Sequence, residues 1–167
     1  MNYHKIEKTS IANGEGIRVV LWVSGCDLHC KGCHNPETWG FNSGKHFNLE
    51  TKNELFEALD KPYIKGITFS GGNPLDSFPE VFTLCKDIKE KFPTKDIWLY
   101  SGYTYEEIQP KIMGMILEYI DVLVDGQYID AQRDLTLQWC GSRNQRVIDV
   151  QKSLKAHKIV LYHHSDT

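Results

Sequence analysis

The sequence predicts an α/β protein, a partial (βα) barrel with a mostly parallel, curved sheet and outer helices. Short β-branched apolar runs alternate with segments of helical periodicity, which is typical of parallel strands joined by helical crossovers. The first such run, 17–23, is almost continuously apolar, as expected for a strand covered on both faces. The 167 residues are too few for eight βα units and contain no linker-like stretch, so we expect a single domain over 1–167.

Four apolar runs predict the parallel strands of this sheet. They lie at 17–23, 66–70, 96–100 and 120–124. The segments at the two ends of the chain are less regular. Residues 1–16 are polar and are expected to be irregular, 147–155 fits a strand, a short helix or both, and 159–162 is a candidate last strand.

The segments between the strands have the spacing of helices. Residues 51–54 have capping-box spacing and predict a helix that begins at Thr51. Apolar residues recur every three or four positions through 79–92, which predicts a second helix. Thr104 opens another capping box, and Pro110 is expected to break the helix that follows.

Three cysteines, Cys26, Cys30 and Cys33, follow the first strand at Cys-x3-Cys-x2-Cys spacing. Three thiolates on one tight loop can hold three irons of a 4Fe–4S cluster, and the fourth iron then stays open for chemistry. Gly32 within the loop lets the backbone curl around a bulky inorganic core.

Two other interpretations of the three cysteines remain open. A zinc site normally has four protein ligands, and Cys85 and Cys140 are the only other cysteines that can supply the fourth. Cys85 lies on the apolar stripe of a predicted helix, where a buried free thiol is common, and the role of Cys140 stays open. The other alternative is a loop of unliganded thiols.

Several motifs together resemble one family within the radical S-adenosylmethionine superfamily. Residues 13–16 (Asn-Gly-Glu-Gly), the cysteine motif with His34 and Asn35, and Thr38-Trp39 look like the activating proteins of anaerobic ribonucleoside-triphosphate reductase. Further similar segments lie at 70–75, 95–98, 101–103, 122–126 and 141–145. These matches run in order over nearly the whole chain.

The resemblance implies a radical enzyme with two cofactors. Cys26, Cys30 and Cys33 would hold a 4Fe–4S cluster whose open iron binds the amino and carboxylate groups of S-adenosylmethionine. Reductive cleavage would give methionine and a 5′-deoxyadenosyl radical that takes the α-hydrogen from one glycine of the large reductase subunit. The implied partners are that large subunit and a flavodoxin-type electron donor.

Further cofactor-binding positions are implied at the carboxyl edge of the predicted sheet. They are Gly32, Cys33, His34, Gly71, Gly72, Asn73, Ser101 and Asp125. Small residues there would let the methionine end of the cofactor approach the backbone, and a hydroxyl or carboxylate would bind ribose hydroxyls. A glycine pair after a strand is also a common turn, and Ser101 and Asp125 also fit a helix cap and a loop carboxylate.

Two of these positions depart from the superfamily pattern. Gly32 stands where many members have an aromatic residue, so His34 is expected to contact the region near the adenine. Asn73 stands where an acidic residue is more common, which leaves backbone carbonyls to accept hydrogen bonds from the methionine ammonium.

Composition limits the remaining function classes. A net charge of −3 gives no reason to expect nucleic acid or an anionic membrane as partner. No apolar run reaches membrane-spanning length and no signal peptide is recognisable, so we expect a cytoplasmic protein, in which five cysteines favour metal or redox use. Two other functions stay open, namely activation of another glycyl-radical enzyme of the formate-lyase type and a non-catalytic zinc-binding interaction module.

Overall fold

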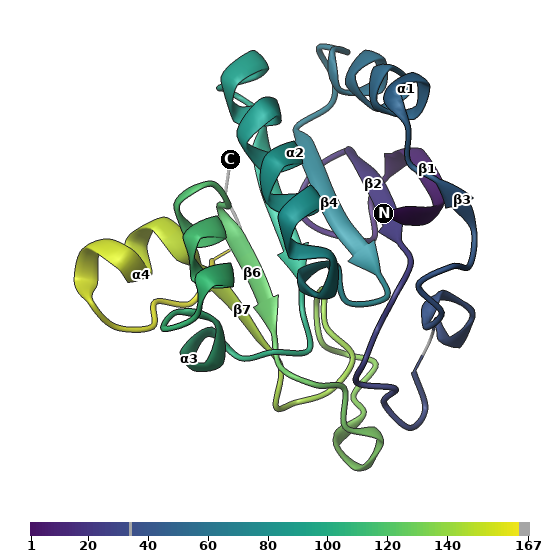
Figure 1. Cartoon of the computed structure of the whole chain (residues 1–167). Coiled ribbons are helices and arrows are strands. Elements are labelled where there is room, and N and C mark those ends of the chain that lie inside the picture. The colour runs from purple at the N-terminus through teal and green to yellow at the C-terminus, as the bar shows by residue number, and fades with distance from the viewer. Residues whose placement is uncertain (34, 164–167) are drawn as a thin grey trace.

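The computed structural model describes residues 1–33 and 35–163, and within these ranges it contains an open, seven-stranded sheet between helices and loops (Figure 1). The strand order is β3-β1-β2-β4-β5-β6-β7. The strands are β1 (Asn2–Ser10), β2 (Arg18–Val23), β3 (Lys45–His46), β4 (Gly66–Gly71), β5 (Asp96–Tyr100), β6 (Val122–Asp125) and β7 (Arg146–Asp149). The α-helices are α1 (Leu49–Leu59), α2 (Phe78–Lys91), α3 (Tyr105–Ile108) and α4 (Val150–Ala156). Short 3-10 helices are η1 (Pro36–Thr38), η2 (Pro74–Ser77), η3 (Ile112–Glu118) and η4 (Asp130–Gln132).

The centre of the sheet is parallel, as the alternation of strands and helices predicts. Strands β2, β4, β5 and β6 pair in parallel, with Val20 opposite Thr68 and Thr68 opposite Trp98. The flanks differ from this expectation, because β1, β3 and β7 are antiparallel to their neighbours. The carboxyl ends of the four central strands therefore lie together at one edge.

The expectation that residues 1–16 are irregular is wrong for β1. Tyr3 is buried and Ile6 packs against the main core, whereas the strand's other residues are mostly half-buried or exposed. A strand whose polar side chains reach solvent has little apolar signal of its own. Its antiparallel hydrogen bonds to β2, which align Ile6 with Leu21, establish it as a strand.

The first helix begins earlier than the capping box at 51–54 predicts. Helix α1 starts at Leu49, and its N-cap is Asn48, whose side chain accepts a hydrogen bond from the Thr51 N–H at 2.9 Å. Asparagine is at least as good an N-cap as threonine, so the helix takes the earlier start. The capping box at Thr104 is confirmed, with Glu107 as its second member.

The C-terminal third resolves the alternatives left open by the sequence. Pro110 does interrupt the helix, since α3 ends at Ile108 and the chain continues as η3. The segment 147–155 contributes both to strand β7 and to helix α4. The candidate last strand at 159–162 is reduced to a single bridge between Leu161 and Ile148.

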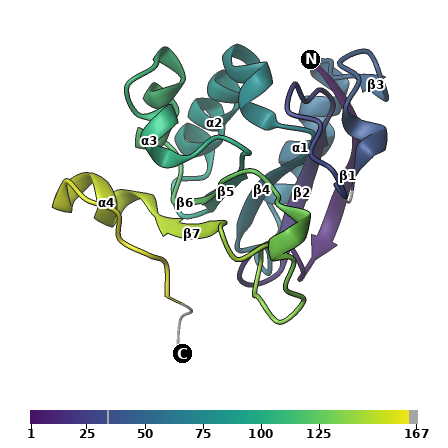
Figure 2. The same ribbon diagram turned by 90° about the horizontal axis from the view of Figure 1, so that it is seen from below.

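Helices α1, α2 and α3 lie on one face of the sheet (Figure 2). Alternate strand residues such as Leu21, Phe69 and Leu99 form the main core on that side. The intervening residues face the other way, and we call this second side the opposite face. There Trp98, fully buried, packs edge-on against Trp139 and Tyr162 at centroid distances of 4.9 and 5.1 Å.

A buried arginine occupies the amino end of the opposite face. The Arg18 side chain is fully buried, pairs with Asp96 at 2.6 Å and lies 5.3 Å from the centroid of the Trp98 ring. Its guanidinium also donates to Thr68 Oγ1 at 2.8 Å and to the Glu15 carbonyl at 3.0 Å. These bonds satisfy a charge that burial alone would disfavour.

The described part of the chain contains no helix that is both long and apolar enough to span a bilayer.

Candidate cofactor site

A cavity of about 690 Å³ lies on the opposite face, at the carboxyl edge of the sheet. This volume is in the range of small-molecule and cofactor sites. Its lining combines the cysteine loop after β2 (Cys26, Cys30, Cys33), the end of β4 (Ser70 to Asn73), the end of β5 (Tyr100 to Gly102) and the 126–145 segment after β6. The segments that the sequence placed at one edge therefore share one cavity.

The cysteine loop is held by backbone hydrogen bonds to the turn that follows it. The N–H groups of Gly25 and Cys26 donate to the carbonyls of Thr38 and Trp39 at 2.7 and 3.0 Å. His29 adopts a left-handed conformation (φ 47°), and its ring stacks on Trp39 with centroids 4.5 Å apart. The loop is thus folded back on itself, with Cys26 buried and Cys30 and Cys33 half-buried.

Backbone N–H groups lie near two of these sulfurs. Burial raises the pKa of Cys26 above its ordinary value, and the backbone N–H groups of His29 and Leu28 oppose this rise only in part. The Asn35 N–H lies 3.4 Å from the Cys33 sulfur. Hydrogen bonds to cysteine sulfur are among the features that tune the potential of iron–sulfur clusters.

The three thiols of the loop are a donor set that a 4Fe–4S cluster can use. Within residues 1–33 and 35–163, no three His, Cys, Asp or Glu side chains are gathered around one ion position. A 4Fe–4S cluster binds each thiolate through a different iron, so its three cysteines need not converge on one point. Three thiols on one loop, lining one cavity, meet that requirement.

The glycine pair after β4 packs directly against the cysteine loop. A Cβ atom on Gly72 would lie 2.4 Å from the Gly25 carbonyl oxygen, so no side chain fits there. The N–H groups of Gly72 and Asn73 donate to the carbonyls of Val23 and Gly25, both at 2.8 Å. The turn therefore needs glycine for close backbone approach, and the same residues also line the cavity.

Asn73 and Ser101 are buried beside the cavity and contact each other. The Ser101 hydroxyl donates to Asn73 Oδ1 at 3.0 Å and accepts the Tyr103 N–H at 3.1 Å. The Asn73 amide nitrogen has no hydrogen-bond partner in the described part of the chain, although Asn73 is only 2% exposed. A buried donor without a partner is uncommon, and it leaves a hydrogen bond available to a ligand.

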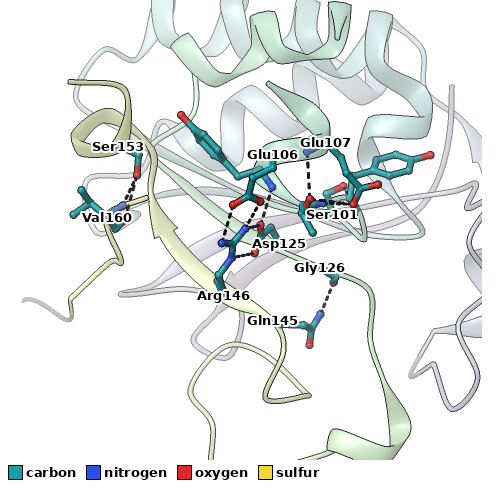
Figure 3. A network of polar contacts seen from close by, with 12 residues as sticks. Ser101, Glu106, Glu107, Asp125, Gly126, Gln145, Arg146, Ser153 and Val160 are labelled. Carbon is teal, nitrogen blue, oxygen red and sulfur yellow. Dashed lines mark hydrogen bonds and ion pairs between the residues drawn. The ribbon is translucent and has the colours of Figure 1, made fainter. Parts of the chain in front are cut away.

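Asp125 has a different environment from Ser101. Its carboxylate is fully buried, accepts the Tyr105 N–H at 2.8 Å and pairs with Arg146 at 2.6 Å. Arg146 also pairs with Glu106, so it lies between the two carboxylates (Figure 3). Asp125 is not among the described residues that line the cavity, whereas the next residue, Gly126, is. Its predicted contact with ribose stays a prediction.

Gly32 lies close to the loop after β6. His34, the other predicted contact in the cysteine motif, lies outside the described residues. Gly32 has a φ of 77°, and a Cβ there would lie 2.7 Å from the Asp130 carboxylate and 3.3 Å from the Tyr128 ring. Tyr128 donates its hydroxyl to Asp130 at 3.0 Å and lines the cavity. The loop after β6 therefore occupies the space that a side chain at position 32 would need.

The sequence reasoning missed the wall formed by residues 126–141. Tyr128, Leu135, Trp139 and Cys140 all line the cavity. The one available signal was the position of this segment directly after a predicted strand, at the edge that carries the other candidate residues.

Of the two remaining cysteines, Cys85 is fully buried in the main core, as its helical stripe predicts, and burial raises its pKa.

Comparisons with known proteins identify the class of the chain. A family model described as a 4Fe-4S single cluster domain matches residues 12–148. The chain is therefore a protein of the 4Fe–4S single-cluster domain class.

Curated relatives narrow the class further. The anaerobic ribonucleoside-triphosphate reductase-activating protein of Enterobacteria phage T4 is 42% identical over 151 residues, covering 88% of this chain and 93% of the relative. The proteins of the same name from Vibrio cholerae and Escherichia coli K12 are 42% and 40% identical, covering 87% and 88% of this chain and 96% and 97% of their own lengths. This chain belongs to the family of anaerobic ribonucleoside-triphosphate reductase-activating proteins, which confirms the family that the motifs predicted.

Proposed function

We propose that this protein activates an anaerobic ribonucleoside-triphosphate reductase through radical S-adenosylmethionine chemistry. The observation that carries the proposal is that the three cysteines of one loop line the same cavity as Gly72, Asn73 and Ser101. Family membership supports the activation of that reductase, because the relatives are named for it. We also propose that the open sheet is a partial (βα) barrel forming a single domain, and that the protein works in the cytoplasm.

Cys26, Cys30 and Cys33 would hold the 4Fe–4S cluster, and the open iron would accept the amino and carboxylate groups of S-adenosylmethionine. When bound and reduced, the cluster would supply the one-electron reduction that cleaves the sulfur–C5′ bond of S-adenosylmethionine, and with it the hydrogen abstraction from the partner's glycine. The cavity walls would position the cofactor beside the cysteine loop.

The other residues of the edge would orient the cofactor. The unpaired amide nitrogen of Asn73 is a donor suited to a carboxylate oxygen, and the Ser101 hydroxyl fixes the amide through Oδ1. Gly71 and Gly72 keep this turn close to the cysteine loop. His34 near the adenine, and Asp125 as a ribose ligand, remain predictions.

The proposed substrate is a macromolecule, the glycine-bearing loop of the large reductase subunit. Leu135 lines the cavity and yet is 79% exposed, so the cavity wall is accessible to a partner from outside. The proposed electron donor is a flavodoxin-type protein.

The test uses the full chain, reconstituted anaerobically with iron and sulfide. We expect about four irons and four sulfides per chain, and 5′-deoxyadenosine and methionine after addition of dithionite and S-adenosylmethionine. The variant Cys30→Ala should lose this cleavage. The matched control Cys85→Ala, which removes a cysteine from the core instead of the loop, should keep both cluster and cleavage.

Adding the reductase identifies the partner. A glycyl-radical signal in electron paramagnetic resonance is expected with anaerobic ribonucleoside-triphosphate reductase and not with a formate-lyase. One zinc per chain, with no cleavage even in the presence of the reductase, would overturn the enzyme proposal in favour of a zinc-binding interaction module.

A further inference from the structure

Two side chains with no role so far, Asp76 and Tyr103, link the loop after β5 to the cysteine loop. Asp76 belongs to η2, and its Oδ2 accepts the backbone N–H of Asp27 at 3.0 Å. Its other oxygen, Oδ1, accepts the hydroxyl of Tyr103 at 2.5 Å. Asp27 is the residue directly after Cys26, so this carboxylate is hydrogen-bonded to the peptide that follows the first cysteine.

A second set of bonds closes these contacts into a hydrogen-bond ring. The Tyr103 N–H donates to the Ser101 hydroxyl, which donates to Asn73 Oδ1. The Asn73 N–H then donates to the carbonyl of Gly25. The ring thus holds the chain at the residue before Cys26 and at the residue after it, and it joins the loops that follow β2, β4 and β5.

The ring also places the half-buried carboxylate of Asp76, a negative charge, close to Cys26. Two hydrogen bonds, one from a backbone N–H and one from a phenol, hold this carboxylate in place beside the cysteine loop. A fixed negative charge near an iron–sulfur cluster opposes the addition of an electron, and net charge and hydrogen bonding are the variables that set cluster potentials.

We propose that Asp76, held by Tyr103, is a positioning residue that fixes Cys26 and lowers the reduction potential of the cluster bound there. This inference rests on the proposed ligation by Cys26. A low potential makes the reduced cluster a stronger one-electron donor, which reductive cleavage of a sulfonium requires.

The test is a potentiometric titration of the cluster-loaded full chain, with dithionite as reductant and without S-adenosylmethionine. Dithionite supplies one electron to the cluster, and the reduced fraction is followed by electron paramagnetic resonance. The variant Asp76→Asn keeps an oxygen for the Asp27 N–H but removes the charge. We expect the cluster to become about tenfold easier to reduce, which is about 59 mV for a one-electron couple.

Two further variants separate charge from structure. Tyr103→Phe keeps the carboxylate but removes its phenol donor, so the potential should move in the opposite direction, to more negative values. Asp87→Asn removes a carboxylate from α2 that pairs with Lys52 at 2.7 Å, and it should leave the potential unchanged.

The outcomes distinguish the two proposals. If Cys26→Ala still binds a complete cluster, the proposed ligation fails and this inference fails with it. If Cys26→Ala loses the cluster while Asp76→Asn binds it fully at the wild-type potential, only the role of Asp76 is overturned. Should Asp76→Asn assemble no cluster, Tyr103→Phe carries the test, and an unchanged potential in that variant overturns the proposal.

Discussion

Gly72→Ala is the substitution that most directly tests whether close backbone packing positions the cysteine loop. The new Cβ would lie 2.4 Å from the Gly25 carbonyl oxygen and 2.8 Å from its carbonyl carbon. Ordinary van der Waals contact begins near 3.4 Å, so the two loops must separate by about 1 Å. That movement stretches the hydrogen bond from the Asn73 N–H to the same carbonyl, now 2.8 Å long.

The magnitude follows from three effects. Overpacking a close contact destabilises a protein by about 1–3 kcal/mol, and a weakened backbone hydrogen bond adds about 1 kcal/mol. Replacing glycine by alanine restricts the unfolded chain and offsets about 0.4–1 kcal/mol of this loss. We expect the free energy of unfolding to fall by about 2 kcal/mol, which is about 4–8 °C in Tm for a chain of this size.

The assay is urea denaturation of the cluster-free protein under reducing conditions, followed by iron analysis after reconstitution. Gly40→Ala is the matched control, because a Cβ at position 40 would meet its nearest neighbour at an ordinary 3.7 Å. Gly72→Ala should be less stable than this control and should bind less iron, since the residues flanking Cys26 are displaced. Equal stability and full iron binding in both variants would refute the packing argument.

Two further predictions concern the ion pairs of Arg146. Arg146→Gln removes the ion pair of the buried Asp125 carboxylate and leaves it, among the described residues, with the Tyr105 N–H as its donor. Urea denaturation should therefore show a loss of about 2–4 kcal/mol, and a loss below about 0.5 kcal/mol would contradict this role. The Glu106 carboxyl is 59% exposed and its hydrogen bond from Arg146 lowers its pKa, so Glu106→Gln should lose less than about 1 kcal/mol at neutral pH. Because the pKa is lower in the folded state, this stabilisation is present above the unfolded carboxyl pKa of about 4.3 and is lost as the pH falls through the folded value. Unfolding curves of wild type and Glu106→Gln should therefore converge at low pH, and a difference that persists there would contradict the sign.

The central strands were predictable because each carries its own signal. Strands such as β2 and β5 are covered on both faces in a parallel sheet, so their sequences are apolar almost throughout. Strand β1 has no such run, because it lies near the edge of the sheet and exposes many of its side chains. Its strand conformation comes from hydrogen bonds to β2, which local composition does not encode.

The site was predictable in outline for a similar reason. The cysteine spacing is local, and parallel strands bring their carboxyl ends to one edge, so Cys26, Gly72 and Ser101 were expected near one another. Asp125 ends a strand at the same edge, yet its carboxylate pairs with Arg146, a residue far along the chain and on an antiparallel strand that the sequence left undecided. The direction in which a polar side chain at a strand end points depends on such partners.

The sequence by itself determined the α/β class, the cysteine loop and the family, because each depends on residue type and spacing within short segments. Only the tertiary structure decided which neighbours those segments meet. It packs Gly72 on Gly25, places the 126–141 segment over Gly32, and links Asp76 to both Asp27 and Tyr103. These contacts join residues far apart in the sequence through single hydrogen bonds and close approaches, and no periodicity or motif specifies such pairings before the sheet has assembled.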